Sequence, residues 1–335
     1  MKAVVLVGGF GTRLRPLTLG VPKQMLPVVD RPMIERVVAS LGANGVTDAI
    51  LSLGYKPDAF MQAYPDGTCA GVRLHYAVEP EPLDTAGAVR FAALDAGIDD
   101  RFIVVNGDVL TDVDVSAIWA FHDKQGAEGT ISLTPVEDPS RYGVVPIDAD
   151  GRVEAFIEKP PADEAPSKWI NAGTYVLEPS VLARIPDGRK VSIERETFPA
   201  MVADGTLYAL HSDEYWVDSG TPATYLQVQL DLVNGVRGRE AAVSPSATVA
   251  TGATIIDSVV MQDVQVAADA SIEGSAILPG ARIGAGAQIR GSIVGPGAVI
   301  GDGAVLDGLT VIGDGVTIEA GSTLHGARVP ENATA

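Results

Sequence analysis

Two different patterns of apolar and polar positions divide the chain. From residue 1 to about residue 234, apolar runs of strand length alternate with helix-length stretches. The strand-like runs are 3–7, 49–53, 102–105, 130–136 and 174–177, and the helix-like stretches include 32–43 and 86–96. Pro32, near the start of the first of these helical stretches, suits the first turn of a helix. This alternation predicts an α/β fold built on a largely parallel sheet.

After about residue 243 the pattern changes to a six-residue repeat. Glycines and small residues separate the apolar positions, as in "GPGAVIGDGAVL". The repeating positions are Val243, Val249, Ile255, Val260, Val266, Ile272, Leu278, Ile283, Ile289, Val294, Ile300, Leu306, Ile312, Ile318 and Leu324, with steps of five after Ile255, Leu278 and Ile289. Six residues do not return to one helical face, whereas stacked short strands use this period. The repeat therefore predicts a β-solenoid over residues 243–330, preceded by a glycine-containing linker at 233–242.

Composition narrows the classes of function. A chain of 335 residues can form two domains, and its net charge of -19 argues against binding nucleic acid through a basic surface. The one cysteine, Cys69, excludes an intramolecular disulfide. No apolar run approaches the length of a membrane span, and the short run after Lys2 is too short for a signal peptide. We therefore expect a cytoplasmic protein without membrane or nucleic-acid partners.

The stretch "LVGGFGTRLRPLT" follows the first predicted strand. Glycines in such a turn let backbone N–H groups approach a phosphate. A Walker A loop is excluded because Gly11-Thr12-Arg13 stands where Gly-Lys-Ser/Thr is required. A dinucleotide fingerprint is disfavoured because Leu14 replaces its third glycine. Arg13, with Lys23 ten residues later, supplies positive charge for phosphate oxygens. The stretch therefore predicts a loop that binds a polyphosphate.

This G-G-x-G-T-R-L…P-K combination resembles the signature of the sugar-nucleotide pyrophosphorylases, which join a sugar 1-phosphate to a nucleoside triphosphate. The resemblance implies a Rossmann-like nucleotidyltransferase domain with a mixed, mostly parallel sheet over residues 1–232. The repeat half resembles the left-handed β-helix of hexapeptide-repeat proteins. The resemblance also implies a set of nucleotide-binding residues: Leu6, Gly8, Gly9, Gly11, Thr12, Arg13, Lys23, Glu79, Asp84, Thr85, Ala86 and Asp108.

Further segments agree with this resemblance in order along the chain. Asp108 in "FIVVNGDVL" and Asp218 in "YWVDSGTP" are implied to hold Mg²⁺, and carboxylates suit that hard cation. The segments "RYGVV", "AFIEKPP" and "INAGTYVL" imply a sugar-phosphate site made by Gly143, Glu158, Lys159, Asn171 and Gly173. Catalysis is implied for Arg13, Lys23 and Lys159. The segments "EDPSRYGVV", "SIERETFPAMV" and "YWVDSGTP" resemble mannose-1-phosphate guanylyltransferases most closely.

The base is predicted from Glu79 in "VEPEPLDTAGA". A carboxylate only accepts hydrogen bonds, and guanine presents two adjacent donors, so Glu79 favours GTP. Two residues depart from the family pattern. Asp84 stands where the family has glycine, and it either adds an acceptor for guanine or reshapes the pocket. Gln24 stands where many guanylyltransferases have proline and thymidylyltransferases often have glutamine.

The expected reaction converts GTP and mannose 1-phosphate to GDP-mannose and pyrophosphate, by Mg²⁺-dependent in-line attack of the sugar phosphate on the α-phosphate. A phosphate monoester has a second pKa near 6, so the nucleophile is ionised at neutral pH and needs no general base. Three alternatives stay open: a glucose-1-phosphate thymidylyltransferase, a transferase for another sugar or cyclitol 1-phosphate, and a non-catalytic regulatory paralogue. No motif decides the sugar.

The solenoid is expected to assemble the protein into a homo-oligomer, a dimer or a tetramer, because its stacked strands offer flat faces to another subunit. Solenoids in other proteins serve as acyltransferases that use a catalytic histidine. His325 is the one histidine of the repeat half and follows its last regular repeat position. We expect a surface or capping role for it.

Overall fold

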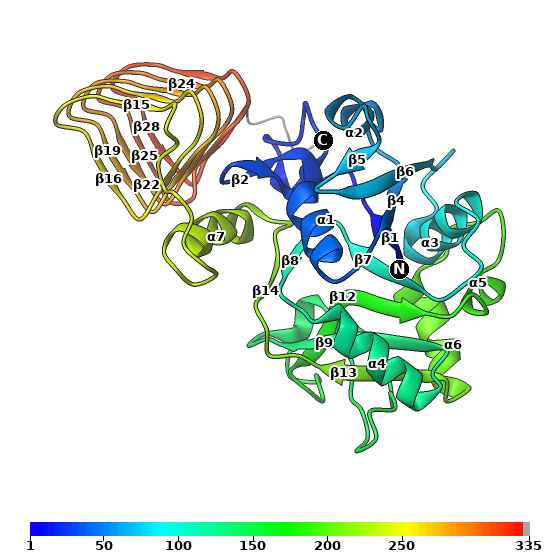
Figure 1. The fold of residues 1–335 in the computed structure, drawn as a ribbon. Coiled ribbons are helices and arrows are strands. Elements are labelled where there is room, and N and C mark those ends of the chain that lie inside the picture. Colours follow the sequence, from blue (N-terminus) through cyan, green and yellow to red (C-terminus); the bar gives the residue numbers. More distant parts are fainter. Residues whose placement is uncertain (331–335) are drawn as a thin grey trace. The chain divides into compact units, whose positions relative to one another are not determined.

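The structure, a computed structural model, describes residues 1–330 and contains two compact units (Figure 1). Residues 1–9 and 34–216 form the first unit. Residues 10–33 and the chain from residue 217 onward form the second. Most of the predicted phosphate loop, residues 10–18, therefore belongs to the same unit as the C-terminal repeats, whereas its first residues, 6–9, belong to the first unit.

The first unit is a mixed ten-stranded sheet with helices. Its strands are β1 (Lys2–Leu6), β4 (Asp48–Leu53), β5 (Thr68–Cys69), β6 (Val72–Val78), β7 (Phe102–Asn106), β9 (Gly129–Pro135), β10 (Gly143–Val144), β11 (Ile157–Glu158), β12 (Trp169–Leu177) and β13 (Leu207–His211). The order is β11-β10-β12-β7-β1-β4-β6-β5, and β9 lies between β12 and β13. Strands β7, β1, β4 and β6 are parallel, whereas β12 runs antiparallel to both β7 and β9.

Helices and short strands connect this sheet. The helices are α1 (Met33–Ala43), α2 (Asp58–Ala63), α3 (Asp84–Asp95), α4 (Val115–Gln125), α5 (Val181–Arg184) and α6 (Phe198–Ala203), with short helical turns η3 (Pro139–Arg141) and η4 (Ile193–Thr197). The short strands are β8 (Val109–Thr111) and β14 (Trp216–Asp218). All five predicted strand runs and both predicted helical stretches are confirmed in type, and the α/β fold class is confirmed with them.

Side-chain alternation explains how the helices cover the sheet. Val4, Ile50 and Val104 share one buried cluster with Val89 and Ala92 of α3. Their strand neighbours point to the opposite face because successive side chains alternate. On that opposite face the fully buried His122 of α4 contacts Thr130 of β9. The sheet is therefore buried on both faces, which is why its central strands consist of nearly continuous apolar runs.

The second unit begins with the loop segment and continues in the C-terminal half. The loop contains the short helical turns η1 (Thr12–Leu14) and η2 (Lys23–Met25) and a small hairpin of β2 (Pro27–Val28) and β3 (Arg31–Pro32). Helix α7 (Pro222–Val233) starts with a capping box at Thr221 and Thr224. The buried Gln229 of α7 accepts from the Val29 N–H at 2.7 Å and donates to the Pro27 carbonyl at 2.8 Å. Helix α7 thus holds the hairpin of the loop segment.

The repeat half forms three parallel five-stranded sheets, an arrangement consistent with the expected left-handed β-helix. One sheet contains β15 (Thr248–Val249), β18 (Gln265–Val266), β21 (Arg282–Ile283), β24 (Val299–Ile300) and β27 (Thr317–Ile318). The second contains β16 (Thr254–Ile256), β19 (Ser271–Glu273), β22 (Gln288–Arg290), β25 (Val305–Asp307) and β28 (Thr323–His325). The third contains β17 (Val259–Val260), β20 (Ala276–Ile277), β23 (Ile293–Val294), β26 (Val311–Ile312) and β29 (Arg328–Val329).

One predicted repeat position is wrong. Val260 pairs with Ile277, and Ile277 pairs with Val294, so Ile277 and not Leu278 belongs to the stacked column. Leu278 is also buried, which is why hydrophobicity alone did not separate the two. The five-residue step therefore falls before Ile277 rather than after Leu278.

Buried serine hydroxyl groups stack at one corner of the solenoid, just before the strands β17, β20 and β23, where one turn of the solenoid takes 17 residues. The backbone N–H of Ser275 donates to the hydroxyl of Ser258, 17 residues earlier, at 3.0 Å. The backbone N–H of Ser292 donates in the same way to Ser275 at 3.1 Å. The next coil is one residue longer, because Leu309 is inserted before Thr310 at this corner and adopts a left-handed φ of 64°.

Within residues 1–330, no helix has the combined length and apolar character needed to cross a bilayer.

Candidate functional site

The first unit brings together two predicted nucleotide residues that are far apart in sequence. Glu79 follows β6, and one of its carboxylate oxygens would lie 3.2 Å from a methyl group added at Gly8. That carboxylate accepts hydrogen bonds from the Ser52 hydroxyl at 2.9 Å and the Leu83 N–H at 3.1 Å. Glu79 is therefore held in place beside the start of the phosphate loop. A carboxylate can accept further hydrogen bonds beyond these two, so it retains capacity for a ligand.

The departure at Asp84 has a backbone explanation. Asp84 is the first residue of α3 and adopts a φ of 62°, the left-handed conformation that glycine takes without a steric penalty. Its exposed side chain accepts a hydrogen bond from the Thr85 N–H at 2.8 Å, which fits an acid at a helix N-terminus. The family's glycine is thus accounted for by backbone geometry.

Thr85 and Ala86 have internal partners in this structure. The Thr85 hydroxyl donates to Glu194 at 2.7 Å and accepts from the Ile193 N–H at 2.8 Å. The Ala86 N–H donates to the Val191 carbonyl at 2.9 Å, and the Ala86 side chain is fully buried. These two predicted nucleotide residues therefore connect the start of α3 to the segment 191–194.

A second group of predicted residues lies at the ends of β1 and β7 and in the middle of β12. The Gly107 N–H donates to the Leu6 carbonyl at 2.9 Å, which places the turn containing Asp108 beside the end of β1. Gly173 has a left-handed φ of 75°, and a methyl group added there would lie 2.5 Å from the Asn106 amide nitrogen. Asn171 accepts from the Gly173 N–H at 2.9 Å across a register shift between β12 and β9. Asn106, two residues before Asp108, therefore contacts Gly173 of the predicted sugar site.

The third group lies where β10 and β11 pair. Gly143 is directly opposite Glu158, and a methyl group added at Gly143 would lie 2.7 Å from the Phe156 ring. Lys159 forms an ion pair with Glu158 at 3.1 Å and keeps 58% of its side chain exposed. This exposure leaves the ammonium group accessible to an anionic ligand. The structure therefore brings Gly143, Glu158 and Lys159 together, as the sequence predicted.

Trp216 connects the second and third groups and was missed from sequence. Its indole N–H donates to the Ala172 carbonyl at 2.8 Å, between Asn171 and Gly173. Its ring contacts Tyr142, the neighbour of Gly143, edge to face at a centroid distance of 5.5 Å. Trp216 and Asn106 both stand inside segments that had been singled out, but a single sequence does not show which neighbour of a predicted site residue supports it.

Ser52 was also missed, although the sequence carries a signal for it. It is a polar residue inside the apolar run 49–53, and in the structure it is completely buried. Buried hydroxyl groups need hydrogen-bond partners. Its acceptors are a Glu79 carboxylate oxygen at 2.9 Å and the Ala88 carbonyl at 3.3 Å, and the shorter bond helps to orient the predicted base-reading side chain.

The second unit holds the remaining predicted residues. Gly11 has a left-handed φ of 63°, and a methyl group added there would lie 3.1 Å from both Lys23 and Thr18. The Thr18 hydroxyl donates to the Gly11 carbonyl at 2.8 Å and closes the turn. Thr12 and Arg13 are exposed on η1, whereas Leu14 and Leu17 anchor the loop in the interior. Gly11 and Lys23 are therefore adjacent, and Arg13 presents its guanidinium at the surface.

Arg13 and Asp218 meet at Gly220. A methyl group added at Gly220 would lie 2.7 Å from the Arg13 Nη2 and 2.8 Å from the Asp218 Oδ1. The same oxygen accepts from the Gly220 N–H at 2.8 Å. A side chain at this position would have to displace the Arg13 guanidinium or the Asp218 carboxylate, and Gly220 is thus a further residue that sequence analysis missed.

The donors predicted for Mg²⁺ suit that ion in chemistry. Asp108 and Asp218 are half-buried carboxylates. Among residues 1–330, no three His, Cys, Asp or Glu side chains gather into a ready-made metal site. Mg²⁺ is usually held by one or two carboxylates together with substrate phosphates rather than by a complete protein cage. Two carboxylates therefore fit this mode of binding.

Gln24, the second departure from the family pattern, is buried in the structure. Its side chain is 1% exposed, and no hydrogen-bond partner for its Oε1 occurs within residues 1–330. A base cannot reach a side chain that is covered on all sides. Gln24 is therefore a core residue of the loop segment.

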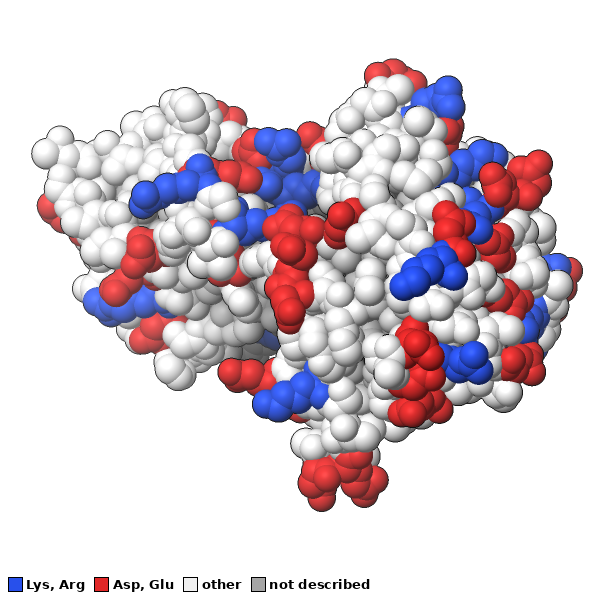
Figure 2. Space-filling model, turned by 60° about the horizontal axis from the view of Figure 1, so that its bottom comes forward, with Lys and Arg blue, Asp and Glu red and all other residues white. Residues whose placement is uncertain are grey.

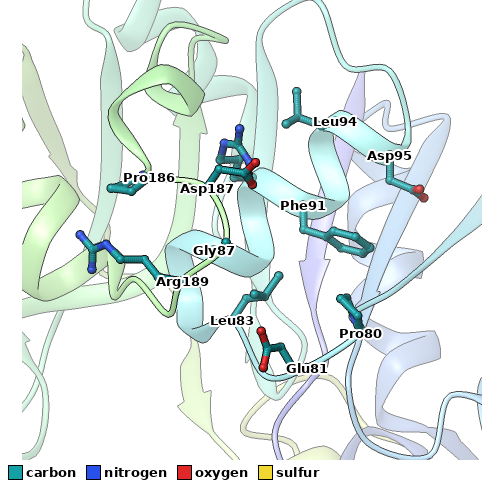
Figure 3. A pocket seen from close by; sticks show the side chains of 12 residues that line it. Pro80, Glu81, Leu83, Gly87, Phe91, Leu94, Asp95, Pro186, Asp187 and Arg189 are labelled. Atoms are coloured by element: carbon teal, nitrogen blue, oxygen red, sulfur yellow. Dashed lines mark hydrogen bonds and ion pairs between the residues drawn. The ribbon is translucent and has the colours of Figure 1, made fainter.

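The surface carries a pocket near Asp84 and, on one face, a mixture of positive and negative side chains. A pocket of about 490 Å³ lies beside the segment that contains Asp84, with Phe91, Leu94 and Pro186 among its lining residues (Figure 3). None of the predicted site residues lines it, although Pro80, Leu83 and Gly87 of its lining directly neighbour Glu79, Asp84 and Ala86 in sequence. On the face shown in Figure 2, Lys and Arg side chains are interspersed with Asp and Glu.

Sequence profiles of two families match this chain. The nucleotidyl transferase family matches residues 2–235, and the GMPPB C-terminal domain matches residues 238–334. Among solved structures, HddC from Yersinia pseudotuberculosis has a TM-score of 0.59 and 30% identity, and the match covers 68% of this chain and 97% of HddC. HddC has also been solved in a complex with GMP-PN.

Curated relatives are similar over most of the chain. A mannose-1-phosphate guanylyltransferase of Mycobacterium tuberculosis is 42% identical over 271 residues, covering 78% of this chain and 75% of the relative. A mannose-1-phosphate guanyltransferase of Aspergillus fumigatus is 46% identical over 232 residues, covering 68% of this chain and 62% of the relative. The match thus spans less than two thirds of the fungal protein. The loop, the strand-end residues and the repeats agree with these matches, and the chain belongs to the nucleotidyl transferase family.

Proposed function

We propose that this protein transfers a guanylyl group from GTP to mannose 1-phosphate and releases pyrophosphate, with GDP-mannose as the product. The observation that carries the proposal is the contact between Glu79 and Gly8, which puts a fixed hydrogen-bond acceptor beside the start of the phosphate loop. Guanine presents N1–H and N2–H₂ side by side, and a carboxylate accepts from both. The names of the mycobacterial and fungal relatives support the same base and sugar.

The nucleophile in this proposal is a phosphate oxygen of mannose 1-phosphate. It attacks the α-phosphorus in line, a new P–O bond forms, and the bond from the α-phosphorus to the β-phosphate oxygen breaks. The electron pair leaves with pyrophosphate. The second pKa of a phosphate monoester is near 6, so at neutral pH no residue needs to remove a proton. Positioning and charge neutralisation then account for catalysis.

The predicted site residues bind the two ends of the reaction, the sugar phosphate and the leaving pyrophosphate. Lys159, exposed and oriented by Glu158, holds the sugar phosphate, while Asn171, Gly173 and Gly143 lie around the sugar. Arg13 and Lys23 neutralise the pyrophosphate that leaves.

The proposal also includes Mg²⁺. Asp108 and Asp218 would hold it, and the bound ion would supply further positive charge against the phosphates. We propose in addition that residues 1–232 carry the catalytic residues and that 233–242 is the linker to the repeats.

A pyrophosphate-release screen tests the proposal. The full-length protein is assayed with four nucleoside triphosphates against several sugar 1-phosphates, with Mg²⁺ present or removed by chelation. GTP with mannose 1-phosphate should give the highest kcat/KM. Preference for thymidine triphosphate with glucose 1-phosphate would instead assign the protein to the thymidylyltransferases.

Glu79→Gln sharpens this screen. An amide both donates and accepts, so the variant should lose preference for GTP over uridine and thymidine triphosphates by about tenfold or more, equivalent to one hydrogen bond to a charged group. Ser52→Ala is the matched variant, because it keeps the carboxylate but removes its orienting hydroxyl. An unchanged base preference in Glu79→Gln would remove Glu79 from base recognition.

We further propose that the solenoid assembles the protein into a homo-oligomer. Its parallel sheets offer flat faces, and oligomers of one chain usually use closed symmetry. Light scattering should then give a particle mass of at least twice the 34.7 kDa of one chain. A mass equal to one chain across the working concentration range would contradict this assembly.

A further inference from the structure

We propose that Arg328, on the last rung of the solenoid, is a positioning residue for the loop that binds the triphosphate. The inference rests on the proposed function, because it assigns to Arg13 and its loop the contact with the triphosphate. It gives the solenoid a task inside one chain, separate from assembly.

The contact joins the two extremes of the sequence. The guanidinium of Arg328 donates from Nη1 to the Arg13 carbonyl at 2.9 Å and to the Arg15 carbonyl at 3.0 Å. A charged donor shared by two carbonyls makes stronger bonds than neutral pairs do. Arg328 itself is half-buried on β29, which pairs in register with β26. One side chain therefore fixes the loop backbone at residues 13 and 15.

The loop is also held by packing. Leu14, which stands between the two tethered residues, has a fully buried side chain. Pro16 is buried as well, and a methyl group added at Gly313, just after β26, would lie 3.1 Å from the Pro16 Cβ. Glycine at 313 therefore lets the loop backbone approach the corner of the solenoid closely. The same methyl group would lie 3.1 Å from the Val329 carbonyl, so the loop, β26 and β29 meet at this point.

The other end of the loop segment reaches the same sheet of the solenoid. Gln229 and Tyr225 of α7 both donate to the Pro27 carbonyl. Helix α7 in turn lies against β17 and β20. Strands β17, β20, β23, β26 and β29 form one continuous sheet, so its first strands support residues 27–29 through α7 and its last strands support residues 13–16 directly.

This double attachment fixes both ends of the loop segment, while Thr12 and Arg13 remain exposed. The segment itself contains only short helical turns, η1 at the first attachment and η2 between the two, and such turns are weak by themselves. Loss of the Arg328 contacts would leave two carbonyls without their charged donor and let η1 shift. A misplacement of about 1 Å can cost about 100-fold in rate when positioning carries catalysis.

Kinetics of the full-length protein test the inference. Arg328→Ala should raise the KM for GTP about tenfold and leave the KM for mannose 1-phosphate within about twofold, because the sugar-phosphate residues lie in the other unit. Arg328→Lys keeps a charged donor without the planar fork and should recover part of the GTP affinity. Arg290→Ala is the matched control, since Arg290 is an exposed arginine on β22 that donates to Gln288 of its own strand.

Calorimetric titration with GTP and no sugar phosphate separates this inference from the proposed function. If the wild type binds GTP but transfers nothing to any sugar phosphate, the proposed function fails, and weaker GTP binding by Arg328→Ala still supports the positioning role. Equal binding by Arg328→Ala and the wild type overturns it, as does an equal rise of both KM values. If Arg328→Ala does not fold, Arg328→Lys decides: GTP binding and kinetics identical to the wild type in that variant would also overturn the role of the fork.

Discussion

The sheet of the first unit and the solenoid of the second unit use β-structure in opposite ways. In the sheet, the predicted site residues lie where the regular pattern stops: Glu79 follows β6, Asp108 follows β7, and Gly173 sits at a register shift of β12. In the solenoid, aliphatic side chains repeat from coil to coil, and its inner column carries no titratable group among the described residues. The predicted site residues thus occur where the regular strand pattern is interrupted. The uninterrupted repeat of the solenoid forms a structural support.

Both regions place some non-glycine residues at left-handed φ values: Lys56, Ala70, Asp84 and Lys159 in the first unit, and Asp257, Asp263, Asp269 and Leu309 in the solenoid. Corners of the solenoid adopt left-handed φ values mostly at glycine, as at Gly274 and Gly291. In the first unit, Asp84 and Lys159 adopt such values although they are not glycine. Non-glycine residues with positive φ are costly and cluster at functional sites. Asp84 and Lys159 therefore combine a predicted site role with a left-handed backbone, whereas Lys56 and Ala70 of the same unit adopt such values without a predicted role.

The largest expected effect is kinetic and falls in the first unit. Lys159→Ala removes the exposed ammonium group and should raise the KM for mannose 1-phosphate about 10- to 100-fold, as expected for a hydrogen bond to a charged group worth about 1.5–3 kcal/mol. The KM for GTP should change far less. Steady-state kinetics measure both, and Lys168→Ala, an exposed lysine in the same part of the chain, is the control. Equal rises of the two KM values would refute the assignment.

The next effect concerns stability in the solenoid. Ile289 is fully buried between Ile272 and Leu306, so Ile289→Val should lower the free energy of unfolding by about 0.5–1.5 kcal/mol. The kinetic constants should stay unchanged, because Ile289 belongs to the supporting column. Ile256→Val is the control, since Ile256 is 53% exposed and should be nearly neutral. Chemical denaturation measures both variants; a change of kcat in Ile289→Val would break the contrast between the two regions.

A smaller effect tests the strain at Asp84. Asp84→Gly relieves the left-handed backbone, which costs a non-glycine residue about 1 kcal/mol. It also removes a favourable charge from the start of α3, worth about 0.3–1 kcal/mol. The net gain in stability should therefore stay below about 1 kcal/mol. Asp84→Ala loses the charge but keeps the strain, so it should be less stable than Asp84→Gly by about 1 kcal/mol. Thermal unfolding of the pair measures this difference, and equal melting temperatures would show that the site carries no strain.

The smallest effect depends on pH and on the core of the first unit. Burial lowers the pKa of His122, which contacts Thr130 at 2.8 Å and Glu178 at 3.2 Å. The unfolded chain binds a proton near pH 6.5, whereas folded His122 resists protonation. His122 therefore supports full stability above about pH 6.5, and part of it is lost as the pH falls below that value. Thermal unfolding at pH 7.5 and 5.5 should show a larger drop for the wild type than for His122→Gln.

Much of the fold could be predicted because its signals are local. The alternation of runs around 3–7, 49–53 and 102–105 depends on neighbours within a few residues, and these runs are β1, β4 and β7. The six-residue repeat depends on spacing alone and correctly predicts parallel stacking. The choice between Ile277 and Leu278 could not be made, because both are apolar and only the coil above and below determines which one points inward.

The candidate site was predicted in part, for a different reason. Motif residues such as Glu158 and Lys159 are adjacent in sequence, so their proximity needed no tertiary information. Their supports come from elsewhere in the chain: Ser52 orients Glu79, and Trp216 contacts the segment around Ala172. Neither support has a pattern of its own, because a serine or tryptophan becomes a partner only when the fold brings its acceptor close.

Local sequence patterns are sufficient to predict the type of each region: an α/β sheet with a glycine-rich phosphate loop, followed by a stacked repeat. These properties follow from short-range periodicity and from the chemistry of residues a few positions apart. Three features become visible only in the folded structure: Gln24 is buried, Glu79 lies against Gly8, and Arg328 donates hydrogen bonds to the carbonyls of Arg13 and Arg15. Such contacts depend on how the chain returns to itself over tens to hundreds of residues, and no local pattern records that path.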